Sequence, residues 1–246
     1  MDFITETVRW LTDPAHWQGQ DGIPNRLIEH LVISGLSLGI ALAIALPVGI
    51  WVGHTGRFSS IAVNAANLGR AMPSIAIIAI VLPITTAIDP QAGFRFYPTL
   101  IAMVVLAIPP ILVNAYAGIS GVESELVESA RGMGMRERDI LLRVEIPVAI
   151  PVIVAGMRLA AVQVVATATL GAIFASGGLG RYLVEGIAQN DDPMIYSGVF
   201  LVAALAIATE VVFAVFQRLA TSPGLRLERQ VVRPEQQLTP ILPHAL

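Results

Sequence analysis

Two residue types are absent from this chain of 246 residues, cysteine and lysine. Without cysteine the protein can form no disulfide framework, no thiol active site and no cysteine metal centre. Without lysine it cannot supply the side chain with which a P-loop holds nucleotide phosphates. The sequence also shows no set of nucleophile and base and no metal-binding motif. We therefore expect a protein that is not an enzyme and has no cofactor. Any ATP that drives it must be hydrolysed by a separate subunit.

Charged and aromatic residues are scarce. Only 13% of the residues are charged and 6% are aromatic, whereas 55% are hydrophobic and the mean hydropathy is +0.72. A soluble domain of this length could not bury so much apolar surface, so the solvent of this protein must be lipid. The formal charge of −3 does not point to nucleic acid as a partner. The predicted fold class is an all-α integral membrane protein.

Long apolar stretches define the predicted spans. A helix needs about 20 apolar residues to cross the ~30 Å hydrocarbon core of a bilayer. Counting arginines does not exclude a sixth span, but residues 58–70 are too polar for a separate lipid-facing span, which favours five. The five predicted spans are approximately 29–52, 58–88, 98–117, 148–174 and 195–216.

The chain divides into three parts: a polar N-terminal segment (1–26), a transmembrane domain (27–217) and a tail (218–246). The N-terminal segment lacks the basic start, apolar core and cleavage site of a removable signal peptide. Its residues Trp10 and Trp17 suit the membrane interface. The tail is too short to form a second domain. Its spaced arginines could touch anionic lipid but usually serve only as a topology anchor.

Small residues recur along the first span in two rows. Such rows let helices approach closely in lipid, so we interpret them as packing surfaces rather than as ligand sites. One row contains Gly35, Gly39 and Ala43, and the other contains Ser37, Ala41, Ala45 and Gly49.

The second predicted span is polar in its first half and is interrupted by Pro73. A helix broken at membrane depth is tolerated only where it is buried in protein or lines a cavity. Hydrogen bonds between packed helices explain its polar residues equally well. In the third span, Pro109 and Pro110 predict a kink whose freed backbone groups a nearby asparagine can satisfy. The candidate residues of a pathway wall are Asn64, Asn67, Arg70, Ser74 and Asn114.

A charged connection at 120–146 separates the third and fourth spans. Ser120 and Glu123 have the spacing of a capping box, which predicts that a helix starts there. Apolar residues at helical spacing give this helix one apolar face. They are Val122, Leu126, Ala130 and Met133.

Glycine and proline divide the rest of this connection. Gly132 and Gly134 permit a sharp turn after the first helix. A second short helix is expected over 136–144. Pro147 suits the first turn of a helix and therefore marks the start of the next span.

Arginines are distributed unevenly among the connections. The connection at 120–146 and the tail hold four each, whereas the loops at 89–97 and 175–193 hold one each. By the positive-inside rule, the charged connection and the tail are cytoplasmic. With five spans, the N-terminus is then on the outer side.

Two charges fall inside predicted spans. Arg158 lies eleven residues after Pro147, and Glu210 lies eight residues before Arg218. Both are therefore roughly one-third to one-half of the way in from the cytoplasmic face. A charge at mid-bilayer costs at least ~2.5–3.5 kcal/mol, so each must face protein or water. Their similar depths suggest an ion pair, and the alternative is that both point unpaired into a wet vestibule.

The segment 128–147, ESARGMGMRERDILLRVEIP, resembles the EAA loop of bacterial ABC importer permeases. In that loop Glu-Ala-Ala is followed by three residues, Gly, nine residues and Ile-x-Leu-Pro. Ser129, Val144 and Ile146 are conservative departures from it. The first span, GRAMPSIAII and AIFASGGLG resemble other parts of the same permease domain. ESARGMG, PVAIPVIVAGMR and the GGLG turn are most similar to the osmoprotectant branch, and methionine-type permeases are the nearest alternative.

The resemblance implies a subunit of a bacterial binding-protein-dependent importer in the inner membrane. Its solute would be of the glycine betaine, carnitine, choline or proline type. The implied partners are two cytoplasmic ATPase subunits, a second permease that is identical or paralogous, and an extracellular solute-binding protein. The charged connection would be a coupling helix that docks into an ATPase groove. The residues that match this role are Glu128, Ser129, Ala130, Arg131, Gly132, Gly134 and Pro147.

Two other classes of function remain open from the residues alone. A secondary transporter should show internal repeats and midplane carboxylates, but the chain has no evident repeat and only Glu210 at that depth. A membrane scaffold without transport activity would need none of these features.

Overall fold

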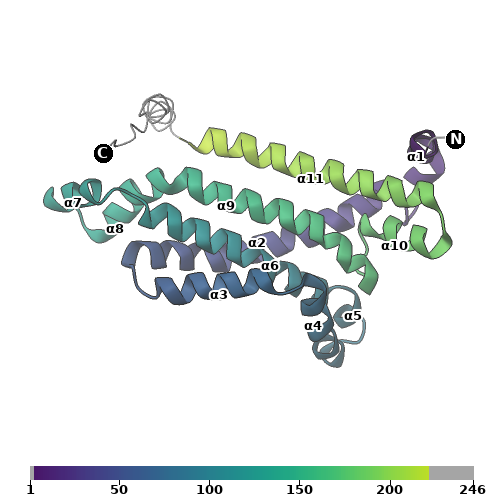
Figure 1. Ribbon diagram of the computed structural model, residues 1–246, viewed down its shortest axis with the longest axis horizontal. Coiled ribbons are helices and arrows are strands. Elements are labelled where there is room, and N and C mark those ends of the chain that lie inside the picture. Colours follow the sequence, from purple (N-terminus) through teal and green to yellow (C-terminus); the bar gives the residue numbers. More distant parts are fainter. Residues whose placement is uncertain (1–2, 222–246) are drawn as a thin grey trace, which may run out of the picture.

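The protein is an elongated bundle of helices (Figure 1). A computed structural model describes residues 3–221, and within this range it contains no strand. Four segments are long and apolar enough to cross a membrane. Their main helices are α2 (Ile23–Thr55), α6 (Tyr97–Ser120), α9 (Ile146–Thr167) and α11 (Asp192–Ala220).

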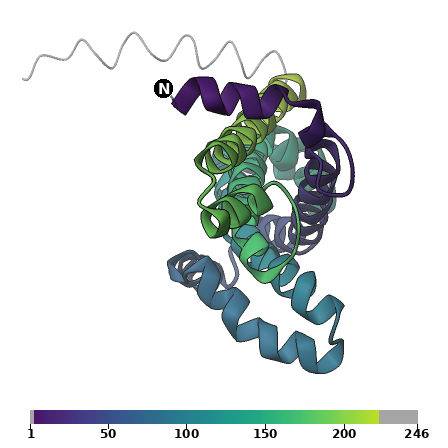
Figure 2. The same ribbon diagram turned by 90° about the vertical axis from the view of Figure 1, so that its right-hand side faces the viewer.

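Helices α3 (Ser59–Ala71) and α4 (Ser74–Ile88) meet at a 90° bend, and they form a fifth span if they are counted together. Pro73 lies at this break, so the predicted interruption of the second span is confirmed. Both helices pack against α6, and the blue segment that contains α4 lies on the lower side of the molecule in Figure 2. The all-α fold with up to five spans agrees with the sequence prediction.

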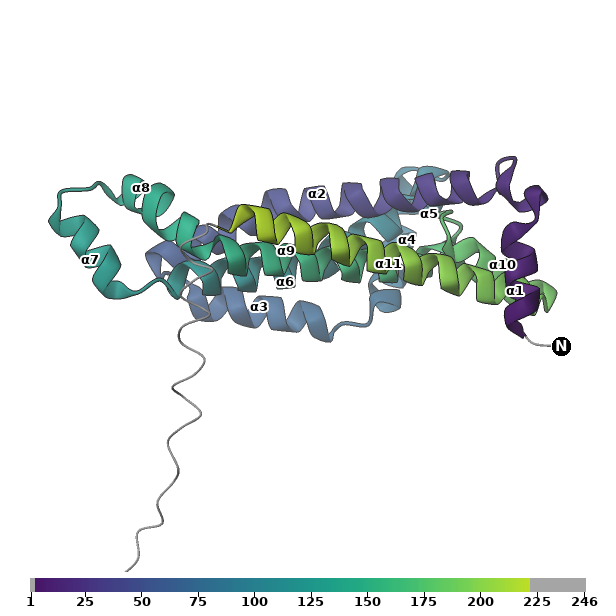
Figure 3. The same cartoon turned by 90° about the horizontal axis from the view of Figure 1, so that it is seen from above.

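The two ends of the bundle carry different short elements (Figure 3). One end holds α7 (Ser124–Gly132) and α8 (Glu137–Ile140), and we call it the turn end. The opposite end holds α1 (Phe3–Thr12) and α10 (Gly180–Gln189), and we call it the α10 end. The helical run from α8 to α9 passes through one π-helical turn, Leu141–Glu145.

Small residues let the central helices approach closely. Helix α6 packs against both α2 and α9, with Ala102 and Ala107 fully buried. A Cβ atom added at Gly49 would lie 2.7 Å from the Leu112 carbonyl oxygen, and one at Gly156 would lie 2.4 Å from the Asn114 Cβ. Side chains at either glycine would push these helices apart, as expected for helix pairs that associate in lipid.

The two small-residue rows of α2 have different surroundings. Ser37, Ala41, Ala45 and Gly49 are all buried, so this row is a packing surface as predicted. Gly35, Gly39 and Ala43 are exposed in the single chain. A Cβ atom at Gly35 or Gly39 would meet nothing within 4 Å.

Three local predictions were wrong. Ser120 ends α6 instead of starting the next helix, and α7 begins at Ser124 without a side-chain cap. The predicted capping box fails because the apolar pattern of α6 continues through the buried Ile119 and keeps Ser120 helical. Pro147 lies in the first turn of α9, as predicted, but this helix is not separate, because helical structure runs without a break from Glu137 to Phe174. The short helix predicted over 136–144 is only its first part.

The third wrong prediction concerns residues 175–193, expected to be a loop. This segment contains α10, whose glycines Gly180 and Gly186 allow close packing on neighbouring elements. The N-terminal segment is likewise structured: it forms α1, the 3₁₀ helix Pro14–Trp17 and the start of α2. Most of the predicted tail, residues 222–246, lies outside the described range.

Candidate functional site

The turn between α7 and α8 is closed by two backbone hydrogen bonds. The Met135 N–H donates to the Ala130 carbonyl at 3.2 Å, and the Gly134 N–H donates to the Arg131 carbonyl at 3.0 Å. Together they form a Schellman motif with Gly134 as its left-handed residue. The φ of Gly134 is +81°, a conformation that other residues resist. The predicted glycine turn is therefore present, and Gly134 is the residue that makes it.

The surface of this turn is largely uncovered. Of the seven residues assigned to coupling, only Ala130 is buried, at 2% exposure. Leu126 and Met133 of the predicted apolar face are 43% and 77% exposed. The exposed coupling residues are Glu128, Ser129, Arg131, Gly132, Gly134 and Pro147. A mixture of exposed apolar and charged side chains suits a protein interface.

An ion pair joins α7 to α8 across the turn. Arg131 Nε and Nη2 donate to the two carboxylate oxygens of Glu137, at 2.8 and 3.0 Å. This bidentate arrangement fixes both the distance and the orientation of the two side chains. The hydrogen bond to Glu137 raises the pKa of Arg131 above its ordinary value. Arg131 is thus committed within the turn, whereas Glu128 lies in the middle of α7 and cannot cap it.

A second contact holds the turn to the transmembrane bundle. His54, in the last turn of α2, places Nδ1 2.6 Å from a carboxylate oxygen of Glu145, in the π-helical turn before α9. An ionised carboxylate only accepts hydrogen bonds, so Nδ1 is the donor. The side chains are 16% and 8% exposed, and the second ring nitrogen of His54 lies 4.0 Å from Glu137. His54 therefore connects α2 to both α8 and the start of α9.

No motif in the sequence points to this contact. The two residues are 91 positions apart. In the described range, no group of three histidine or acidic residues could hold a metal ion.

Arg158 and Glu210 are brought together between α9 and α11. Arg158 Nη2 donates to Glu210 Oε1, and Arg158 Nη1 also donates to Gln217 Oε1 at 3.3 Å. Gln217 in turn donates to the Pro151 carbonyl at 2.8 Å. The Arg158 and Glu210 side chains are 34% and 40% exposed in the single chain. These hydrogen bonds join α9 to α11 at two positions along the helices, which lie about two helical turns apart.

The predicted pathway residues do not gather in one place. A cavity of about 780 Å³ lies between α2, α3 and α6 and is lined by apolar groups. Its lining does not include Asn64, Asn67, Ser74 or Asn114. Asn64 and Asn67 are exposed on α3, and Ser74 starts α4. The side chain of Arg70 lies outside the part of the chain that the structure describes.

Asn114 donates to the Pro110 carbonyl at 2.8 Å. The two prolines instead free the carbonyls four residues earlier, at Val105 and Leu106. The expectation that Asn114 satisfies those groups was therefore wrong.

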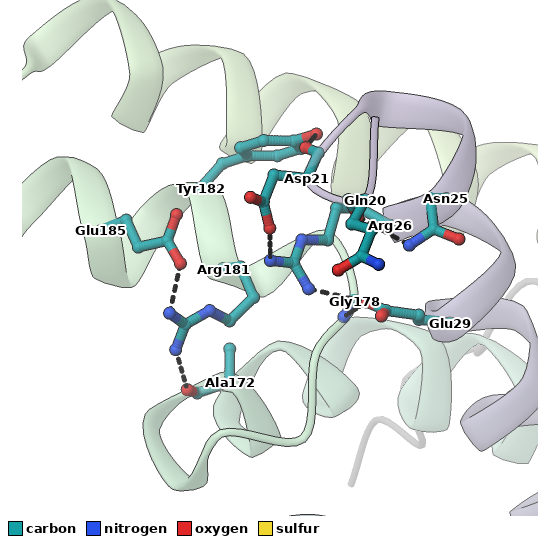
Figure 4. A network of polar contacts seen from close by, with 10 residues as sticks. All are labelled: Gln20, Asp21, Asn25, Arg26, Glu29, Ala172, Gly178, Arg181, Tyr182 and Glu185. Carbon is teal, nitrogen blue, oxygen red and sulfur yellow. Dashed lines mark hydrogen bonds and ion pairs between the residues drawn. The ribbon is translucent and has the colours of Figure 1, made fainter. Parts of the chain in front are cut away.

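A polar network organises the α10 end (Figure 4). Arg26 donates to Asp21 at 2.5 Å and to Glu29 at 2.9 Å, and Glu29 also accepts the Gly178 N–H at 2.8 Å. Gly177 has a φ of +80°, and a Cβ atom there would lie 2.6 Å from a Glu29 oxygen, so the Gly-Gly turn needs glycine for two reasons.

Tyr182 closes the same network. Its hydroxyl donates to the Asp21 carbonyl at 2.7 Å, and burial raises the pKa of Tyr182 to about 12. The hydroxyl therefore stays protonated and remains a donor at neutral pH. This contact ties α10 to the segment that precedes α2.

Comparison with known proteins places this arrangement in a family. The model of the family described as "Binding-protein-dependent transport system inner membrane component" matches residues 45–225. This range contains the α7–α8 turn, the His54–Glu145 contact and the Arg158–Glu210 pair.

Two relatives of named function are similar over most of their length. The carnitine transport permease protein OpuCB of Listeria monocytogenes is 33% identical over 82% of this chain and 89% of its own. The glycine betaine/carnitine/choline transport system permease protein OpuCB of Bacillus subtilis is 33% identical over 82% of this chain and 90% of its own.

A solved structure of the MetNI methionine ABC transporter, in an inward-facing conformation, has a similar fold. The TM-score is 0.71 with 21% identity, covering 86% of this chain and all of that one. At this identity the likeness concerns the fold alone. Taken with the family match and the two relatives, it shows that this multi-pass chain belongs to the family of binding-protein-dependent transport system inner membrane components.

Proposed function

We propose that this chain is the transmembrane subunit of an ATP-driven importer for small compatible solutes of the glycine betaine, carnitine or choline type. Two relatives that are 33% identical carry these solutes in their names. The absence of lysine from the chain supports the expectation that ATP is hydrolysed in a separate subunit.

The observation that carries this proposal is the α7–α8 turn. It projects from one end of the bundle (Figure 3), and its exposed face combines Leu126 and Met133 with charged residues. A rigid, closed turn with an uncovered mixed surface is suited to seat in a groove of another protein. We propose that the partner is a cytoplasmic ATPase subunit, which puts the turn end and the C-terminus in the cytoplasm and the α10 end outside.

The mechanism we propose is alternating access. Two ATPase subunits close on ATP and draw together the turns of two permease subunits, which are identical or paralogous. The pathway between the permeases then opens outward and receives solute from an extracellular binding protein. Hydrolysis of ATP resets the complex. The work comes from the different affinity of the two states for ATP, because a ligand can shift an equilibrium only by its differential binding.

The contacts of the turn give its residues separate roles in this mechanism. Arg131 stiffens the turn through Glu137, so the charges left on α7 to face an ATPase are Glu125 and Glu128. His54 carries displacement of the turn into α2 through Glu145. The Arg158–Glu210 pair holds α9 to α11, so that these two spans move together. Asn64, Asn67, Arg70, Ser74 and Asn114 remain candidates for the pathway wall.

A methionine-type importer is the second candidate, and the fold of the methionine transporter favours it. A secondary transporter or a scaffold would need no ATPase. Co-purification of an ATPase with the full-length chain separates these classes from an importer.

A glycine substitution tests the coupling role directly. Valine at Gly134 must adopt a left-handed conformation at a cost of about 1–2 kcal/mol, which distorts the turn without touching the membrane helices. In a complex reconstituted with its partners, Gly134→Val should retain membrane insertion and ATP hydrolysis but lose solute uptake. Gly134→Asn is the matched control, because asparagine tolerates the left-handed conformation and should keep the turn. Normal coupled uptake by Gly134→Val would contradict the proposed docking role.

A further inference from the structure

A second, polar cavity lies at the α10 end, far along the bundle from the coupling turn. Its volume is about 360 Å³, which suits a small solute. Three arginines from three different segments line it: Arg26 in α2, Arg95 in α5 (Ala92–Arg95) and Arg181 in α10. One acidic residue, Glu29, and one aromatic residue, Phe96, also line it.

Two of the three guanidinium groups are already paired (Figure 4). Arg26 donates to both Asp21 and Glu29, and Arg181 pairs with Glu185 and donates to the Ala172 carbonyl at 3.4 Å. Their positions are therefore fixed by the protein and do not depend on a ligand.

Arg95 differs from the other two. It is exposed, and its guanidinium has no ion pair or side-chain hydrogen bond among the residues that the structure describes. Glu29 accepts from Arg26 and Gly178 through one carboxylate oxygen, and it forms no ion pair with Arg95 among the described residues. The cavity thus presents one guanidinium without a protein partner beside two whose positions are fixed by ion pairs.

We infer that this cavity receives the carboxylate of a small zwitterionic solute, with Arg95 as the residue that binds it. A guanidinium binds a carboxylate through two parallel hydrogen bonds, a geometry that an ammonium group cannot reproduce. Phe96 also lines this cavity, and an aromatic ring can attract a quaternary ammonium group through its π face. The inference rests on the proposed function, because the solute class comes from it.

The consequence is a specificity that resides in the permease itself. Glycine betaine and carnitine possess both a quaternary ammonium group and a carboxylate, whereas choline has the ammonium group alone. Arg95 should therefore favour the carboxylated solutes, and Phe96 should act on all three alike. A solute-binding protein that accepts all three would then deliver them to a permease that distinguishes them.

Binding to the full-length chain in lipid nanodiscs tests the site without the ATPase. The readout is thermal stabilisation of the chain by glycine betaine or by choline, because a ligand of the folded state raises its stability. We expect glycine betaine to stabilise the wild type more than choline does, and Arg95→Gln to abolish this difference. Arg95→Lys should retain part of it. Arg9→Gln, at an exposed arginine of α1 on the same end, should change nothing.

Uptake in cells without other osmoprotectant transport provides the second readout. With the full set of partner subunits present, Arg95→Gln should raise the KM for glycine betaine at least ~10-fold, the loss expected for one charged hydrogen-bonding contact. The KM for choline should change less than about 2-fold. Phe96→Leu should raise both values to a similar extent.

The outcomes separate this inference from the proposed function. If uptake remains coupled to ATP but Arg95→Gln alters neither readout, or alters glycine betaine and choline equally, the carboxylate site is refuted and the importer stands. If the nanodisc difference depends on Arg95 but the reconstituted complex shows no ATP-driven uptake, the site stands and the importer fails.

Discussion

The contact between His54 and Glu145 gives the sharpest energetic prediction. Glu145 is only 6% exposed, and His54 Nδ1, at 2.6 Å, is its one hydrogen-bond donor in the described range. His54→Leu removes that donor and leaves a buried carboxylate without a partner. Glu145→Met removes the carboxylate, and the double variant removes both polar groups from the site.

The size of the effect follows from burial. A hydrogen bond to a charged group contributes about 1.5–3 kcal/mol, and a buried charged group left unpaired costs at least as much. Because both side chains are largely shielded from water, we expect His54→Leu to cost about 2–3 kcal/mol of stability. The double variant should cost less than His54→Leu alone, since replacing both partners by apolar groups can be nearly neutral.

A double-mutant cycle measures the interaction. Unfolding of the full-length chain in mixed micelles gives the free energy of each variant, and their combination gives the coupling energy between the two side chains. In the reconstituted complex, His54→Leu should also raise the ATP hydrolysed per solute imported, because α2 no longer follows the turn. Arg57→Gln, at an exposed arginine of the same end, is the control. A coupling energy within about 0.5 kcal/mol of zero would refute this reasoning.

Three further predictions follow from other contacts. Glu210→Arg should reduce folding yield or uptake, because it places two like charges together. Combining it with Arg158→Glu should partly restore both. Absence of this rescue in a membrane-extraction and uptake assay would count against the ion pair. Gly156→Leu should separate α6 from α9 and destabilise the chain by about 1–3 kcal/mol in the same micelle assay. Gly35→Leu, where a Cβ atom meets nothing within 4 Å, should have little effect on the isolated chain, and equal losses would argue against close packing at Gly156. Folding raises the pKa of Tyr182 from 10 to about 12, so the contribution of this hydroxyl to stability is complete below about pH 10 and disappears as the pH rises through 12. The free energy of unfolding of the wild type should therefore fall across this pH window, and that of Tyr182→Phe should not show this loss.

The elements that the sequence predicted correctly depend on local chemistry or on the cost of polarity in lipid. The Gly134 turn follows from one residue that tolerates a positive φ. The long spans follow from apolar stretches that only a bilayer can accommodate. The approach of Arg158 to Glu210 follows from the expense of leaving two charges unpaired at similar depth.

The features that the sequence did not predict depend on distant contacts or on competition between signals. His54 meets Glu145 only because α2 ends beside the π-helical turn before α9, and nothing in either segment specifies the other. Ser120 and Glu123 fit a capping box, but burial of Ile119 extends α6 through Ser120. Helix α10 was predicted as loop because its glycines, which serve packing, also resemble turn residues.

The polar cavity could not have been predicted for the same reason. Arg26, Arg95 and Arg181 come from three segments, and each one alone is an ordinary arginine near the end of a helix. The pairing of two of them, which leaves Arg95 uncommitted, is visible only when the whole network is assembled.

We expect the α7–α8 turn to face the cytoplasm and to touch an ATPase. Because the chain has no cysteine, a single introduced cysteine can be labelled without background. Ser129→Cys, exposed on α7, should react with a membrane-impermeant maleimide only from the cytoplasmic side, and should cross-link to the ATPase in the assembled complex. Gln189→Cys, exposed at the end of α10, should react only from outside. Labelling of Ser129→Cys from the outer side, or its failure to cross-link to any ATPase in a complex that imports solute, would contradict the account.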